Sequence, residues 1–181
     1  MAQDGPRRIG LTVEVKPHAY DPAENPELFD GVLPRRVLAF AIDVAVILAP
    51  VALAFVVIIL FGLVTFGLGW SLLGLLYPGT VIWALAYYGL TLGGPSSATI
   101  GMRVMEIEMR TWYGAPCYFV LGAVHAVAFY ISFTVLTPFV LLVCLFNQRH
   151  RLIHDIVLGT VVINNAARAA ALRGATALRR Q

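Results

Sequence analysis

The sequence predicts an all-α membrane protein, a small helical bundle of three or four membrane segments with a cytoplasmic polar loop and surface helices. Hydrophobic residues make up 59% of the 181 residues and charged residues only 13%, whereas soluble domains are roughly 25% charged. Residues 44–102 and 111–148 contain no Asp, Glu, Lys or Arg. One spanning helix needs about 20 apolar residues. Both tracts exceed that length, which excludes an ordinary soluble domain.

The two ends of the chain differ from its middle. Residues 1–30 are rich in charge and proline, so we expect a disordered polar tail and no secretory signal, which needs an early apolar core. Residues 31–164 form the expected transmembrane domain. Residues 165–181 are rich in Ala and Arg, which is typical of a frayed tail or of a surface helix on anionic lipid.

Residues 37–64 and 72–92 are the first two expected membrane segments. Pro50 lies within the first segment and removes one helical hydrogen bond. Gly89 and Gly93 end the second segment with the G-x-x-x-G spacing that permits close helix contact.

The polar stretch 93–115 separates these segments from a second apolar tract. From Met105 to Arg110 apolar and polar residues alternate, which predicts a short strand or an interfacial segment. Lys and Arg favour the cytoplasmic side, so we expect residues 1–36, 93–115 and 147–181 on that side. Residues 117–146 would then enter the membrane and return, with a break near 132–138; the alternative is one long tilted span.

Asp43 is an acid set inside the first apolar segment. It lies seven residues after Arg36, or roughly 10 Å along a helix, and on the same face. A charged Asp near the centre of a membrane helix costs about 2.5–3.5 kcal/mol, and such residues are functional by default. Two interpretations remain: Asp43 binds an ion or proton, or it is a hydrogen-bonded strut between helices.

A second acid, Asp155, follows a basic segment that contains Arg149 and Arg151. Because Arg36 and Asp155 should both lie near the cytoplasmic face, Arg36 is a plausible partner for Asp155. The alternative is a solvated acid among arginines.

Histidines add a further candidate site. His125 lies alone in the second apolar tract and either relays protons with Asp43 or is hydrogen-bonded within the bundle. His150 and His154 are one helical turn apart, but their basic surroundings disfavour a cation, so we expect no metal site and no cofactor. Hydroxyl groups such as that of Tyr87 line a polar path or bridge helices.

Three motifs in order resemble those of the RDD family of membrane proteins, which is named for one arginine and two aspartates. The segment 35–43, RRVLAFAID, supplies Arg36 and Asp43, and the segment 154–160, HDIVLGT, supplies Asp155. The segment 99–103, TIGMR, is similar to the family's middle motif. The resemblance covers about residues 30–164. The polar loop after the middle motif carries fewer charges than is common in the family. The motif-supporting residues are Arg35, Thr99, Gly101, Arg103, His154, Gly159 and Thr160.

The resemblance implies a transport role, with some members linked to cation/proton exchange. We expect a multi-pass protein of the bacterial inner membrane with a cytoplasmic N-terminus. It is expected to be a homo-oligomer that uses Asp43, Arg36, Asp155 and His125. The alternative is an accessory or assembly subunit of a larger membrane complex. The lipid bilayer is the expected surrounding, and the positive charge beside membrane segments indicates topology rather than nucleic-acid binding. No catalytic constellation is visible, so we expect no enzyme.

Overall fold

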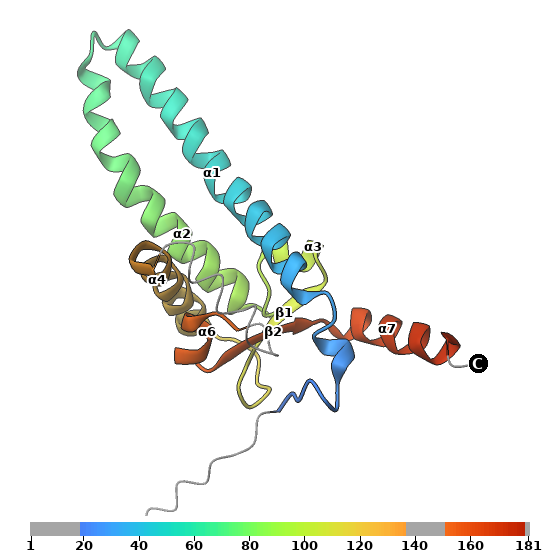
Figure 1. Cartoon of the computed structure of the whole chain (residues 1–181). Helices are drawn as coiled ribbons and strands as arrows, with labels where there is room; N and C mark the ends of the chain where they lie inside the picture. The colour runs from blue at the N-terminus through green and yellow to red at the C-terminus, as the bar shows by residue number, and fades with distance from the viewer. Residues whose placement is uncertain (1–18, 137–150, 180–181) are drawn as a thin grey trace, which may run out of the picture.

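The computed structural model describes residues 19–136 and 151–179, and a long helical hairpin rises from a base of short helices and strands (Figure 1). Helix α1 (Val32–Val64) forms one arm. The 3-10 helix η2 (Leu68–Leu75) and helix α2 (Leu76–Leu92) form the other. The stretches Pro26–Val64 and Leu68–Leu92 are both long and apolar enough to cross a membrane.

Helix α1 follows from its composition. Gly31, at the N-cap, has a φ of 66°, a left-handed conformation that glycine adopts without steric cost. After Asp43, uncharged and mostly apolar residues continue through Pro50 to Val64. At the far end of the hairpin, a Cβ added at Gly62 would overlap the indole ring of Trp70, so this glycine lets η2 fold back closely against α1.

The base contains a two-stranded antiparallel sheet. Strand β1 (Ile107–Thr111) pairs with β2 (Thr160–Asn164), with Ile107 opposite Asn164 and Thr111 opposite Thr160. The short helices α3 (Ile100–Val104) and α6 (Ile153–Val157) precede the two strands. Of the two forms expected from the alternation that begins at Met105, a short strand or an interfacial segment, the structure has the strand.

Helix α4 (Phe119–Leu136) packs closely on α2. A Cβ at Gly89 would lie 2.7 Å from the Phe119 ring, and a Cβ at Gly93 would lie 2.5 Å from the Phe119 backbone nitrogen. Across the contact, a Cβ at Gly122 would lie 2.8 Å from the Tyr88 carbonyl oxygen. The expected close helix contact at the G-x-x-x-G spacing is therefore present.

The core joins the lower hairpin to the base. Its buried side chains come from α1, α2, α3, both strands and the segments beside them, namely Val32, Ala39, Leu92, Ala98, Met102, Ile107, Met109, Cys117 and Val162. Along the upper hairpin most large apolar side chains are exposed, among them Leu53, Leu63 and Leu75. This distribution suits a hairpin that contacts lipid above a base that packs against itself.

Residues 19–30 differ from the disordered tail that the sequence predicted. They include the short 3-10 helix η1 (Pro26–Leu28), and the Phe29 side chain is buried against Val161 and Ile163 of β2. Asn164 donates hydrogen bonds to the Glu27 and Asp30 carbonyl oxygens. The tail prediction overlooked the apolar Tyr20, Leu28 and Phe29, which pack here.

Helix α7 (Ala166–Arg179) extends from the base beyond β2 (Figure 1). This is the helical form of the two expected for the C-terminal residues. The break expected near 132–138 lies partly outside the described residues, and α4 is helical as far as Leu136. Segments 93–116 and 151–164 both meet the start of α1 at the base.

Candidate functional site

Asp43 is buried, with 3% of its surface exposed, and it lies against the N-terminus of α3. Its Oδ1 accepts hydrogen bonds from the Tyr87 hydroxyl at 2.5 Å and the Gly101 N–H at 2.8 Å. Its Oδ2 accepts one from the Thr99 hydroxyl at 2.6 Å. All of these donors are neutral groups of the protein. This arrangement matches the interpretation of Asp43 as a hydrogen-bonded strut between helices.

The middle motif makes this arrangement possible. The Thr99 side chain is the N-cap of α3 and accepts from the Met102 N–H at 3.1 Å. A Cβ added at Gly101 would overlap the Ala39 carbonyl oxygen of α1, so only glycine lets the two helices approach so closely. Helix N-termini favour negative charge, and the carboxylate of Asp43 supplies it from α1.

Arg36 and Asp155 form a buried ion pair. The Arg36 guanidinium lies 2.6 Å from Oδ2 of Asp155, whose side chain has no exposed surface. The same oxygen accepts a hydrogen bond from the Leu152 N–H at 3.0 Å, which caps α6. Burial alone would raise the pKa of Asp155, but the charge of Arg36 leads the opposing interactions, which hold the pKa well below its usual range. The partner predicted for Asp155 is thus its partner in the structure.

Backbone groups around Asp155 are held by Arg151. Its guanidinium donates to the carbonyl oxygens of Thr160 at 2.8 Å and Asp155 at 2.7 Å, and it lies over the Trp112 ring. Gly159 has a φ of 63°, so it permits the tight turn from α6 into β2. Sequence reasoning missed Arg151 and Trp112 as site residues. For Arg151, the available signal was an arginine four residues before the acid Asp155.

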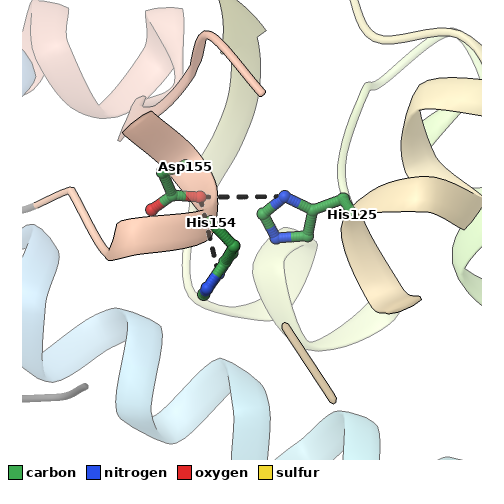
Figure 2. A group of neighbouring side chains, drawn as sticks. All are labelled: His125, His154 and Asp155. Atoms are coloured by element: carbon green, nitrogen blue, oxygen red, sulfur yellow. Dashed lines mark ion pairs between the residues drawn. The ribbon is translucent and has the colours of Figure 1, made fainter. Parts of the chain in front are cut away.

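His125 and His154 lie beside Asp155 (Figure 2). His125 Nδ1 and His154 Nε2 are each 3.7 Å from Asp155 Oδ1. The two imidazole rings meet edge to face with centroids 4.8 Å apart. Burial lowers the pKa of His154, so its ring is neutral near pH 7. The direct contacts of His125 are thus with Asp155 and His154, while His125 and Asp43 line the same cavity, so the proton relay between them stays a prediction.

A cavity of about 190 Å³ lies between the hairpin, α4 and the base. Its lining is mostly apolar, and its polar side chains include Arg36, Asp43, Thr99, His125 and His154. The cavity therefore connects the surroundings of the two acids, which share no direct contact among the described residues.

The remaining motif arginines lie outside this cavity. Arg35 donates to the Met105 carbonyl oxygen at 2.7 Å and pairs with the half-exposed Glu106 at 3.3 Å. Arg103 donates to the Ala98 carbonyl oxygen at 3.1 Å. Arg35 therefore fixes the segment between α2 and β1 to the start of α1, and Arg103 makes a bond within that segment.

The family model of the RDD family matches residues 31–159. No curated protein and no solved structure matches the chain. The matched region includes Arg36, Asp43 and Asp155, together with the middle motif that binds Asp43. The chain therefore belongs to the RDD family, whose members are membrane proteins.

Proposed function

We propose that this protein is a small membrane transporter of cations, acting in cation/proton exchange, with its binding cavity at the base of the hairpin. The observation that carries the proposal is the cavity of about 190 Å³. It is lined by two of the three family-naming residues and by two buried histidines. Ionisable groups inside membrane proteins commonly mark ion and proton pathways.

The residues take different roles in this proposal. Arg36 and Asp155 form the gating ion pair, because the pair joins α1 to α6 and Arg36 lines the cavity. His125 and His154 offer nitrogen atoms to a cation or proton. Asp43 holds α3 in place and shapes the cavity wall, since the polar groups around it already donate to both of its oxygens.

A homo-oligomer in the bacterial inner membrane, with the base on the cytoplasmic side, completes the proposal. The described spans of one chain are too few to enclose an alternating-access path. Two candidate spans with mostly exposed apolar side chains would leave room for a neighbouring copy. The positive-inside rule favours the cytoplasm for the base, because Arg35, Arg36 and Arg103 lie there.

Flux measurements in sealed proteoliposomes test the proposal. Purified protein should move Na⁺, K⁺ or a divalent cation against a proton gradient, followed with a pH-sensitive dye inside the vesicles. Arg36→Gln should alter the rate, because it removes the partner of Asp155. Arg35→Gln is the matched control and should behave like the parent, because Arg35 lies outside the cavity. Absence of any cation or proton movement by the folded parent protein would overturn the proposal.

An accessory or assembly subunit is the second candidate. It is favoured by the hydrogen bonds that protein groups donate to both oxygens of the buried Asp43, an arrangement that resembles a structural joint more than an ion path. Purification in mild detergent would separate the two candidates. A stable stoichiometric partner without cation flux favours the accessory role, and an active homo-oligomer without a partner argues against it.

A further inference from the structure

Three potential metal-ligand atoms converge where α4 faces α6 (Figure 2), and two of them belong to histidines that line the cavity. They are Nδ1 of His125, Nε2 of His154 and Oδ1 of Asp155, and all lie within 4.8 Å of one another. All three residues are buried. The sequence did not indicate this group, because His125 lies about thirty residues before the other two.

The two histidine nitrogens lack the partners that buried polar atoms normally have. Neither Nδ1 of His125 nor Nε2 of His154 has a hydrogen-bond partner among the described residues, although these residues are only 8% and 2% exposed. Buried polar groups are nearly always hydrogen-bonded, and an exception often marks a functional role or an ion. Both nitrogens face the same oxygen of Asp155.

We infer that His125, His154 and Asp155 bind one divalent transition-metal ion of the Zn²⁺, Co²⁺ or Ni²⁺ class. The inference rests on the proposed function, because it names the class of cation that the same cavity would accept. Imidazole nitrogen combined with a single carboxylate suits these ions better than Mg²⁺ or Ca²⁺, which prefer oxygen ligands. Three protein ligands also leave one position of a tetrahedral ion for water or another exchangeable ligand.

The distances require only small movements. Metal–ligand bonds of about 2.0–2.2 Å place neighbouring ligand atoms of a tetrahedral ion roughly 3.4 Å apart. Each histidine nitrogen lies 3.7 Å from the Asp155 oxygen. Rotation of the two rings toward each other would close the remaining separation.

The other oxygen of Asp155 is already held in place. Oδ2 accepts from Arg36 at 2.6 Å and from the Leu152 N–H at 3.0 Å, so Oδ1 is oriented toward the histidines. Ligating carboxylates are commonly supported by such outer hydrogen bonds. The positive charge of Arg36 also repels a cation nearby. The site should therefore bind an exchangeable ion less tightly than a structural zinc site does.

Metal binding can be tested on the full-length chain in detergent micelles, with any affinity tag removed and the protein treated with a chelator. Co²⁺ is the probe, because its visible absorption reports its ligands, and Zn²⁺ is the competitor. We expect one Co²⁺ per chain, displaced by Zn²⁺. His125→Gln and His154→Gln should each weaken binding at least as much as the ~10–100-fold typical of lost outer-shell partners. His18→Gln is the matched control and should bind like the parent.

Folding and transport are followed separately. Circular dichroism identifies a variant that fails to fold, and Co²⁺ should raise the unfolding temperature of the parent protein but not of the His125→Gln/His154→Gln double variant. A parent protein that binds neither Co²⁺ nor Zn²⁺, or equal binding by the double variant, overturns the metal site. Loss of the site while Na⁺ or K⁺ flux persists would leave the proposed function standing. Metal binding without any flux would support the site and contradict transport.

Discussion

Asp43 and Asp155 are two buried acids that perform the same local task with different partners. Each accepts a hydrogen bond from a backbone N–H at the start of a short helix. Asp43 accepts from Gly101 in α3, and Asp155 accepts from Leu152, the N-cap of α6. Asp155 does so within its own helix, whereas Asp43 reaches across from α1.

The partners distinguish the two sites. Asp43 contacts neutral donors, two hydroxyls and an amide. Asp155 contacts a guanidinium and lies beside two histidines. The Asp43 site can therefore fix a helix without any change of charge. The Asp155 site contains histidines, which can gain a proton or bind a cation. The functional proposals therefore centre on it.

The largest expected effect comes from Asp155→Asn. This change leaves Arg36 mostly buried without its carboxylate, and breaking a buried ion pair typically costs about 3–5 kcal/mol. We expect that loss in the free energy of unfolding, measured with denaturant in detergent micelles. A variant as stable as the parent would show that the ion pair contributes little and would weaken the contrast between the acids.

Gly101→Ala tests the close approach of α3 to α1. The added Cβ would overlap the Ala39 carbonyl oxygen and lie 2.9 Å from Asp43 Oδ1, so the helices must separate. Overpacking of this kind typically costs about 1–3 kcal/mol. Gly174→Ala in α7 is the control, since no atom lies within 4 Å of its added Cβ. Equal unfolding curves for both variants would contradict the packing described.

Asp43→Asn should cost less than Asp155→Asn, about 1–3 kcal/mol, because it replaces one accepting oxygen with an NH2 donor that faces the existing donors but leaves no buried charge without its counter-ion. Thermal unfolding of the two variants side by side measures the difference. If Asp43→Asn were the more damaging change, or if it abolished flux in a stable protein, the assignment of Asp43 to structure would be wrong.

Arg35→Gln should have the smallest effect. Its ion pair with Glu106 is partly exposed, and such pairs contribute about 0–1 kcal/mol. The free energies of unfolding of Arg35→Gln and Arg36→Gln, both measured with denaturant, would test whether the exposed ion pair contributes less than the buried one. A loss as large as that of Arg36→Gln would contradict this distinction.

Much of this contrast was predictable from the sequence. The extent of α1 and the position of β1 followed from hydrophobic pattern, and the pairing of Arg36 with Asp155 followed from charge and membrane side. The hydrophobic pattern is a local signal, and the pairing of charges depends only on the depth of each residue in the membrane. The sequence also placed Arg36 and Asp43 on one face of α1, where both line the cavity.

The position of His125 was not predictable in this way. It depends on how α4 is rotated against α2, and that rotation is set by close contacts at Gly89, Gly93 and Gly122. Strand β2 was also missed, because five residues beside a basic segment give only a weak strand pattern. The strand is stabilised by its pairing with β1, which is distant in the sequence.

The hydrogen bonds of Asp43 impose an order on biogenesis. Its donors lie 44, 56 and 58 residues later in the chain, so a ribosome releases α1 well before any of them. Tyr87 arrives first, on the returning arm of the hairpin, and Thr99 and Gly101 follow together. Until then the Asp43 carboxylate must be hydrated, protonated or bound by the insertion machinery. Release of the finished hairpin into lipid would therefore depend on synthesis of the middle motif.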